Sequence, residues 1–182
     1  MLRRGDNTTL MVWEKMKVGE ELPPYWIETD AVDQGRFLVA VAEENPWYFR
    51  DSPFGGPIVH HTMLDGSPMT SMMQRWEYPF GFVHAMQETE FLNPCLLGKR
   101  VQVRGRIADK YVKRGKGYIV VETLCVDEDG VEIMRCRNHA MIDDERVREA
   151  VKSGLRHNPP PLSWRFRKNP SRPLQGHHEA RK

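Results

Sequence analysis

Residues that can exchange protons concentrate in the middle of the sequence. Glu43, Tyr48, His60 and His61 fall within about 20 residues of one another. A carboxylate, a phenol and imidazoles held close together can act as general acid and base on a bound substrate, so this stretch is the candidate catalytic segment. Structural roles are the alternative: Glu43 as a solvated charge, Tyr48 as a loop aromatic, and the histidines as hydrogen-bonding partners of the loop.

Other kinds of chemistry lack their sequence patterns. The chain has no Gly-x-Gly-x-x-Gly, no Walker loop and no Gly-x-Ser-x-Gly, which removes the grounds for a nucleotide site or a serine hydrolase elbow. Three widely spaced cysteines predict reduced core thiols, and Cys136 with His139 has no second pair to complete a metal site. Residues 127–130 lack the further ligands of a calcium loop and predict a hairpin turn.

Charged residues are unevenly distributed along the chain. Its 182 residues carry 27 Lys or Arg and 25 Asp or Glu, but residues 152–182 hold eight of the basic residues and one of the acidic ones. A tail of net charge +7 therefore follows a body of net charge −5. The prolines of the tail predict an extended arm that packs along the body or a neighbouring chain, and its two aromatic residues do not favour nucleic-acid binding.

Length and hydropathy indicate one soluble domain. The chain is too short for two full domains. No stretch approaches the roughly 20 apolar residues that span a bilayer, and the early apolar run at 10–13 is too short for a signal-peptide core. We therefore expect a cytoplasmic protein that binds no membrane.

The candidate catalytic segment follows a predicted helix. This helix covers residues 30–43, with Thr29 as its cap, and Asn45-Pro46 stops it. Its expected apolar positions are Val32, Phe37, Leu38, Val39 and Val41.

A second predicted helix, Met63–Trp76, follows the two histidines. Its regular part begins at Pro68 with Ser67 as the cap, because proline fits the first helical position. The expected buried positions are Met63, Met69, Met72, Met73 and Trp76.

From Gly81 onward, apolar and polar residues alternate, which is the period of half-buried strands. Turn sequences at residues 113–117 and 127–130 join these strands into antiparallel hairpins. Helices followed by such hairpins imply an α+β fold with a helix on one face of a sheet, whose free edges favour dimerisation. We place this domain at residues 18–145, between an N-terminal arm at 1–17 and a basic, proline-rich tail at 146–182.

Two motifs in the candidate segment resemble a known family. Residues 42–48, Ala-Glu-Glu-Asn-Pro-Trp-Tyr, resemble the Gly-Asp-x-Asn-Pro-aliphatic-His signature of the MaoC-like, R-specific enoyl-CoA hydratases. Residues 55–60, Gly-Gly-Pro-Ile-Val-His, resemble the segment that leads into the family's central helix. The resemblance extends from Val18 to Met141 and implies a hot-dog fold, in which an antiparallel sheet wraps a long central helix and pairs with a second hot-dog unit.

In that family, an Asp and a His hold the water that adds to an α,β-unsaturated thioester, while amides near the central helix polarise the thioester carbonyl. Here the Asp position is Glu43, the His position is Tyr48, and the preceding Gly is Ala42. A Tyr at this position is similar to the amino-terminal half of two-hot-dog dehydratases, the FAS1-like dehydratase branch. In those proteins one half supplies catalysis and the other shapes the acyl pocket.

The resemblance implies a set of site residues. Glu43 would be the carboxylate and Tyr48 a donor or pocket wall, while His60 and His61 would either restore acid–base function or bond the loop. Amides around residues 61–63 would hold the thioester oxygen. The substrate-binding residues expected beside them are Asn45, Trp47, Gly56, Thr62 and Met63.

The function implied is hydration or dehydration of an enoyl-CoA or 3-hydroxyacyl-CoA thioester, by a homodimer or beside a second hot-dog subunit. No metal or cofactor is expected, since the CoA thioester is the substrate. Two alternatives stay open: a non-catalytic subunit that shapes the acyl pocket for a catalytic partner, and an acyl-CoA thioesterase, because the fold does not fix the reaction.

Overall fold

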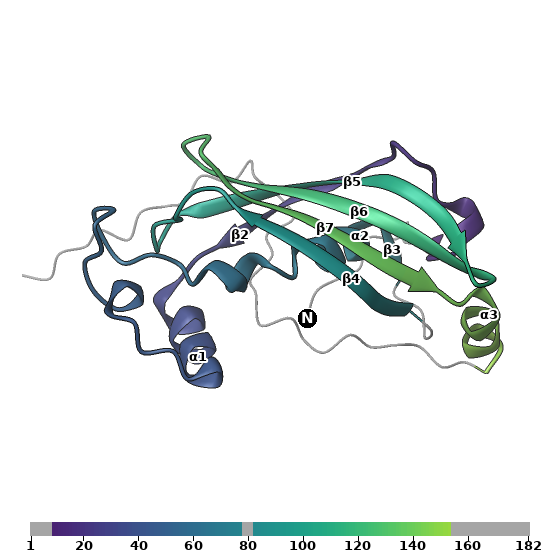
Figure 1. Cartoon of the computed structure of the whole chain (residues 1–182), viewed down its shortest axis with the longest axis horizontal. Coiled ribbons are helices and arrows are strands. Elements are labelled where there is room, and N and C mark those ends of the chain that lie inside the picture. Colours follow the sequence, from purple (N-terminus) through teal and green to yellow (C-terminus); the bar gives the residue numbers. More distant parts are fainter. Residues whose placement is uncertain (1–8, 78–81, 154–182) are drawn as a thin grey trace, which may run out of the picture.

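A five-stranded antiparallel sheet forms the body of the protein. The computed structural model describes residues 9–77 and 82–153 (Figure 1). The sheet has the order β2-β5-β6-β7-β4. Its strands are β2 (Glu21–Glu28), β4 (Phe82–Phe91), β5 (Arg100–Lys113), β6 (Lys116–Asp127) and β7 (Glu132–Ile142). The predicted α+β hot-dog architecture is confirmed.

Alternation along the strands separates a core face from an outer face. In β5, Val101, Val103 and Ile107 are fully buried, whereas Arg104 and Arg106 between them are exposed. This follows from the two-residue period of a strand. The predicted turns between β5 and β6 and between β6 and β7 are confirmed, and each contains a glycine at positive φ.

The sheet arches over α2 (Ser67–Arg75), which a short 3-10 helix, η3 (His61–Leu64), precedes (Figure 1). Small residues let α2 approach closely: a Cβ built at Gly105 of β5 would lie 3.0 Å from the Cβ of Ser71. Met72 is fully buried, but Met69 and Met73 are only half-buried. The helix therefore packs with its small residues as well as with the expected methionines.

The predicted caps of both helices are wrong. Ser67 is the first residue of α2, and its hydroxyl bonds the hydroxyl of Thr123 at 2.8 Å across the core. In α1 (Ala31–Val41), the cap is Asp30, whose carboxylate accepts the amides of Val32 and Asp33 at 2.9 Å. Thr29 instead donates to the carbonyl of Lys99 at 2.7 Å, because the loop before β5 lies against it.

Few side chains pack helix α1 against the rest of the fold. Its buried residues are Gln34 and Leu38, whereas the exposed fractions of Val32 and Val39 are 62% and 83%. The helix ends at Val41, two residues earlier than predicted, because Ala42 takes the left-handed conformation. Thus the segment that follows begins with a sharp change of chain direction.

The core extends beyond residues 18–145. Met11 and Met16, within the expected N-terminal arm, are buried against α2 and β5. Trp13 donates from its indole nitrogen to the carbonyl of Tyr118 at 2.9 Å and fills the space left by Gly117. The remaining elements of this end are η1 (Trp13–Lys15), α3 (Asp144–Lys152) and β1 (Thr9–Leu10), which pairs with β3 (Trp76–Glu77).

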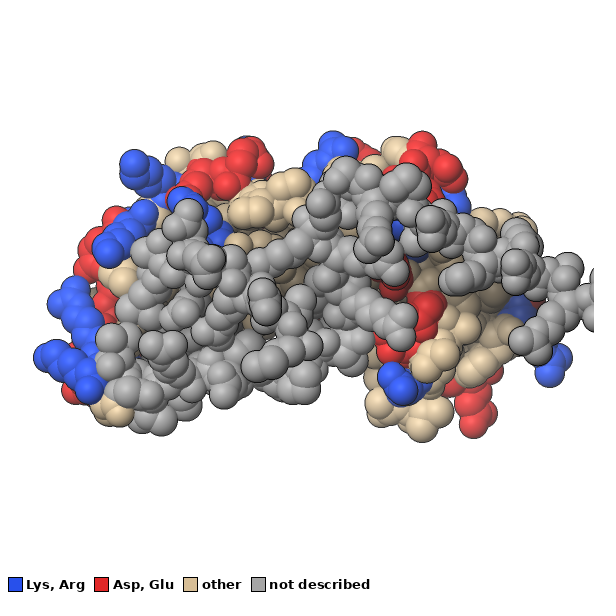
Figure 2. Space-filling model, turned by 180° about the vertical axis from the view of Figure 1, so that it is seen from behind, with Lys and Arg blue, Asp and Glu red and all other residues tan. Residues whose placement is uncertain are grey.

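Most of the basic tail, residues 154–182, and its expected packing lie outside the described residues. On the surface shown in Figure 2, basic and acidic side chains are interspersed among the described residues. Arg106 pairs with Glu122 at 2.8 Å, for example, and Lys116 with Asp143 at 2.7 Å. No helix within the described ranges is long and apolar enough to cross a membrane.

Candidate active site

The motif at residues 43–48 folds as a tight turn. The Asn45 side chain accepts the amide of Trp47 at 3.1 Å and thereby caps η2 (Pro46–Tyr48), and the proline occupies the first turn. Glu43 Oε1 in turn accepts the amide of Asn45 at 2.8 Å. This turn buries the Tyr48 side chain, whose exposed fraction is 9%, beneath the loop that carries the histidines.

That histidine loop is held by backbone hydrogen bonds on two sides. The amide of Ile58 donates to the carbonyl of Trp47 at 3.0 Å, which joins the loop to the motif turn. The amide of Val59 donates to the carbonyl of Cys95 at 2.7 Å, which joins it to the segment after β4. Residues far apart in the sequence are therefore brought to one place.

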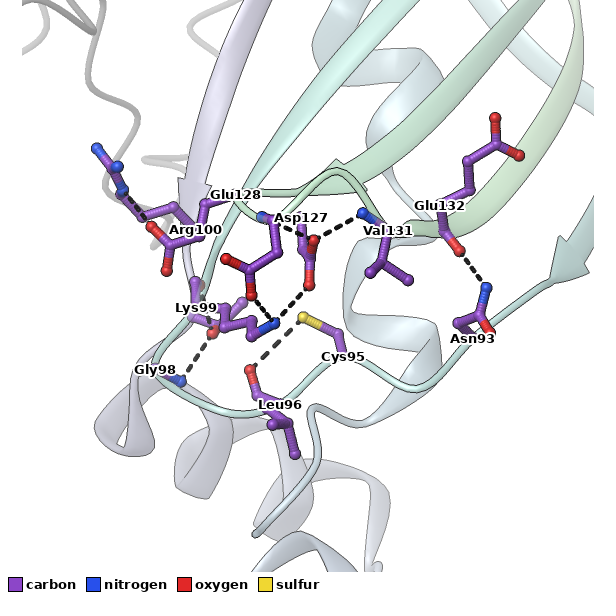
Figure 3. Close-up of polar contacts among 12 residues, drawn as sticks. Asn93, Cys95, Leu96, Gly98, Lys99, Arg100, Asp127, Glu128, Val131 and Glu132 are labelled. Atoms are coloured by element: carbon purple, nitrogen blue, oxygen red, sulfur yellow. Dashed lines mark hydrogen bonds and ion pairs between the residues drawn. The ribbon is translucent and has the colours of Figure 1, made fainter. Parts of the chain in front are cut away.

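The segment after β4 is itself fixed to the β6–β7 turn (Figure 3). Lys99 Nζ donates to Asp127 Oδ2 at 2.8 Å, and the side-chain Nδ2 of Asn93 donates to the carbonyl of Glu132 at 2.8 Å. The Asp127 carboxylate also accepts the backbone amide of Val131. Burial alone would raise the pKa of Asp127, but these hydrogen bonds outweigh it and lower the pKa, so the anchor stays charged.

Tyr48 and His61 meet at the wall of a cavity. The Tyr48 hydroxyl lies 3.2 Å from His61 Nδ1, within hydrogen-bonding distance. His61 also packs edge-on against Phe91, with ring centroids 4.8 Å apart. The cavity has a volume of about 250 Å³ and is otherwise mostly apolar; its lining includes Tyr48, His61, Ile58, Val59, Leu64, Phe91, Cys95 and Ile133.

His60 lies outside this wall, stacked on His61 with centroids 4.5 Å apart. Its Nδ1 accepts the amide of Thr62 at 3.3 Å and lies 2.9 Å from the Thr62 hydroxyl, so the ring proton belongs on Nε2. Burial lowers the pKa of His60, and neighbouring His61 lowers it further, while Glu43, 3.8 Å away, opposes the shift. His60 is therefore neutral near pH 7.

Two groups of the cavity wall, the Tyr48 hydroxyl and the Cys95 thiol, are protonated at neutral pH. Burial, and then the negative charge of Glu43, raise the pKa of Tyr48. Tyr48 is therefore an O–H donor at neutral pH. Burial raises the pKa of the Cys95 thiol to about 12, so this cysteine is not a thiolate nucleophile.

The remaining predicted residues surround the cavity without lining it. Trp47 is 42% exposed and packs on Phe54. The carbonyl of Gly56 accepts hydrogen bonds from Ser52, and Met63 belongs to the hydrophobic core. Two of the amides expected to hold a thioester oxygen are engaged inside the turn: Thr62 donates to the His60 ring and Met63 to the His60 carbonyl. Within the described ranges, no group of three potential metal ligands occurs.

Gln34 and the apolar walls of the cavity were not predicted as site residues. Gln34 is 1% exposed and bonds both sides of the site, although its polar type in a helix predicts exposure. Phe91 and Cys95 flank Asn93-Pro94, and an Asn-Pro pair favours a turn. That turn was the available signal for the cavity wall.

Solved structures share this fold. R-hydratase PhaJ1 from Pseudomonas aeruginosa is 18% identical, with a TM-score of 0.59 over 72% of this chain and 85% of that one. A chain of the ChsH1-ChsH2 complex from Mycobacterium tuberculosis is 15% identical, with a TM-score of 0.57 over 70% and 98%. A chain of the HadBC (3R-hydroxyacyl-ACP dehydratase) complex from the same organism is 17% identical, with a TM-score of 0.59 over 76% and 99%. At these low sequence identities, the structural similarity establishes the shared fold and nothing more.

The family follows from the sequence itself. A search of curated proteins gives no significant match. The model of the FAS1-like dehydratase domain region, however, matches residues 16–136, which cover the sheet from β2 into β7, both helices of the site and the cavity wall. The chain therefore belongs to the FAS1-like dehydratase family, the branch of the MaoC-like hot-dog proteins that the Tyr48 motif resembles.

Proposed function

We propose that the protein hydrates an enoyl thioester, or dehydrates the corresponding 3-hydroxyacyl thioester, as one hot-dog unit of a pair. The observation that carries the proposal is the Tyr48–His61 pair, 3.2 Å apart, on the wall of an apolar cavity. A proton-exchanging pair beside apolar walls suits a substrate whose acyl group is apolar and whose reaction moves protons.

The pair can supply both an acid and a base. With its proton on Nδ1, His61 donates to the Tyr48 oxygen, which leaves Nε2 as a base and the Tyr48 hydroxyl as an acid. In dehydration, Nε2 takes the proton from the carbon next to the thioester, the C–O bond breaks, and Tyr48 protonates the departing hydroxide to give water. The Nδ1 proton then moves to the Tyr48 oxygen, and exchange with water removes the Nε2 proton and restores a proton on Nδ1; hydration is the reverse.

Glu43 and His60 take supporting roles in this proposal. Neither lines the cavity. Glu43 holds the motif turn through the amide of Asn45, and neutral His60 stacks against His61. The acyl carrier is CoA or a carrier protein, and no further cofactor enters the reaction as written.

A second unit would pair along β4. Within the described part of the chain, β4 pairs only with β7, which leaves its other edge open. Val83, Met86 and Phe91 on this strand are 47%, 45% and 48% exposed. Phe91 also lines the cavity, so a partner strand at this edge would cover its mouth.

The direct test is hydration of crotonyl-CoA by the purified full-length chain, alone and with any hot-dog protein that co-purifies. Loss of the absorbance of the conjugated enoyl thioester without release of free thiol is the expected result, and Tyr48→Phe and His61→Ala should each slow it about 100-fold or more. Release of free CoA would instead identify a thioesterase. Full activity in both variants would refute the assigned roles.

A specific observation favours a second candidate, the non-catalytic subunit. The Glu43 carboxylate accepts the Asn45 amide, and the amides of Thr62 and Met63 are engaged within their own turn, so the expected carboxylate and two of the expected carbonyl-binding amides are used by the fold itself. In that case the isolated chain binds an acyl thioester but does not turn it over. Turnover by the chain alone at about 1 per second or faster would rule this candidate out.

A further inference from the structure

Gln34 is hydrogen-bonded to both segments that carry the site. This side chain projects from α1 and is 1% exposed. Its Nε2 donates to the carbonyls of Tyr48 at 2.7 Å and of Ile58 at 3.0 Å. Its Oε1 accepts the amide of His60 at 3.1 Å. Both amide protons and the oxygen are therefore used by backbone groups of the site.

These three bonds span the two segments that carry the proposed acid and base. Tyr48 belongs to the motif turn, and Ile58 and His60 belong to the loop that immediately precedes His61. One further backbone bond, from Ile58 to Trp47, joins the same two segments. The separation of the Tyr48 hydroxyl and His61 Nδ1 thus depends on a small set of bonds, most of which pass through Gln34.

We propose that Gln34 is a positioning residue that sets the Tyr48–His61 distance, an inference that rests on the proposed function of this pair. Its role follows from the chemistry of the carboxamide, which offers two donors and one acceptor on one rigid plane. A Glu at this position keeps the acceptor but has no N–H donors. A Met fills similar space with neither, and an Asn is one methylene too short to reach both segments.

The floor of the cavity is held by other contacts. Val59, Leu64, Cys95 and Ile133 are packed in the core, and the Val59–Cys95 backbone bond does not involve Gln34. Substrate binding in the cavity should therefore survive a loss of Gln34, while the alignment of the reacting pair should not. A positioning role consequently predicts a fall in kcat with little change in KM.

The kinetic test compares Gln34→Glu and Gln34→Met with Ser67→Ala in the full-length protein. Ser67→Ala is the matched control, because it also removes a buried hydrogen bond, to Thr123, and neither of these two residues lines the cavity. For both Gln34 variants we expect kcat to fall about 100-fold, the cost of a misplacement near 1 Å, with KM within about threefold. Ser67→Ala should keep the wild-type kcat. An unchanged kcat in Gln34→Glu, or an equal loss in Ser67→Ala, would overturn the proposal.

A second measurement does not depend on activity. The ring ¹⁵N signals of His61, assigned with His61→Ala, report its hydrogen bond to Tyr48 and can be compared in wild type, Tyr48→Phe and Gln34→Glu. We expect Gln34→Glu to shift these signals toward those of Tyr48→Phe. If wild type is inactive but this shift occurs, the proposed function fails and the positioning role stands. If wild type is active and the His61 signals of Gln34→Glu match wild type, the positioning role fails.

Discussion

Glu43 Oε2 lies 3.8 Å from Nε2 of His60, and neither side chain is part of the cavity wall. The motif position that holds an Asp in the resembling hydratases is thus occupied here by a residue that faces a second histidine. His60 in turn stacks on His61, so the carboxylate faces the histidine that lies outside the cavity. In the proposed mechanism, the acid of the motif is therefore the residue at position 48 and not the residue at position 43.

This arrangement predicts unequal effects on hydration activity. Tyr48→Phe and His61→Ala should each lower kcat about 100- to 10,000-fold, the usual worth of a general acid or base. Glu43→Gln keeps an oxygen that can accept the Asn45 amide, so we expect a loss of no more than about tenfold. Steady-state hydration of crotonyl-CoA measures all three. A loss in Glu43→Gln as large as that in His61→Ala would make Glu43 the base after all.

Stability should depend on pH through His60. Its folded pKa lies below the usual value of about 6.5, chiefly because of burial, so the unfolded chain binds more protons once the pH falls through 6.5. The free energy of unfolding should therefore decrease from pH 6.5 downward, toward the lowered folded pKa, by at most about 1.4 kcal/mol per pH unit for this group.

Urea unfolding between pH 5 and 7.5 is the measurement for this effect. His60→Gln keeps an acceptor for the Thr62 amide and should show a shallower slope than wild type. His139, whose pKa burial and Arg137 also lower, should leave part of the slope in place. His84→Gln, at an exposed position on β4, is the control and should keep the wild-type slope. Equal slopes in wild type and His60→Gln would contradict the assignment.

Local signals in the sequence were sufficient to predict the hairpins of the sheet. The two-residue period and the glycine-containing turns are properties of neighbouring residues, so the hairpins from β5 to β7 could be predicted without knowledge of the rest. The same holds for the Asn45-Pro46 turn, because its cap and its proline are adjacent. The motif that carries Tyr48 was identified by its resemblance to the family signature.

Contacts between distant segments carried no such signal. Gln34 bonds residues 14 to 26 positions away, and Trp13 bonds the carbonyl of Tyr118 across the molecule. A buried Gln in a helix and an apolar residue near a terminus look the same in sequence as exposed ones. The predictions of the helix caps were wrong for a related reason: Thr29 bonds the loop before β5 and Ser67 bonds Thr123 in the core, and these distant partners overrode their preference for capping.

Cys95 should set the length of the acyl group. Its side chain is 3% exposed and lines the cavity at the buried end, together with Leu64. Cys95→Leu would fill part of this space, so we expect kcat/KM for octenoyl-CoA to fall about tenfold more than for crotonyl-CoA. The comparison is made from initial rates with both substrates.

Cys125→Leu is the matched control for this substitution. Cys125 is fully buried in the same core cluster but does not line the cavity. Both variants add volume to a packed core and should lose about 1–3 kcal/mol of stability, measured by urea unfolding. Only Cys95→Leu should change the preference between the two substrates. An equal change in both variants would show that the preference follows stability rather than cavity shape.

Pairing along β4 makes a prediction about assembly. Met86 is 45% exposed on this open edge, and a lysine there would place a charge where a partner strand must pack. Met86→Lys should therefore weaken association at least about tenfold, seen by sedimentation velocity of the full-length chain or its co-purified complex. Val39→Lys, at an 83% exposed position on α1, introduces the same charge away from β4 and should assemble normally. Normal assembly of Met86→Lys, or dissociation by Val39→Lys, would place the interface elsewhere.

Loss of pairing along β4 should also lower activity, because Phe91 of the same strand contacts His61 at the cavity. Assembly and hydration should therefore both be lost in Met86→Lys and both be retained in Val39→Lys.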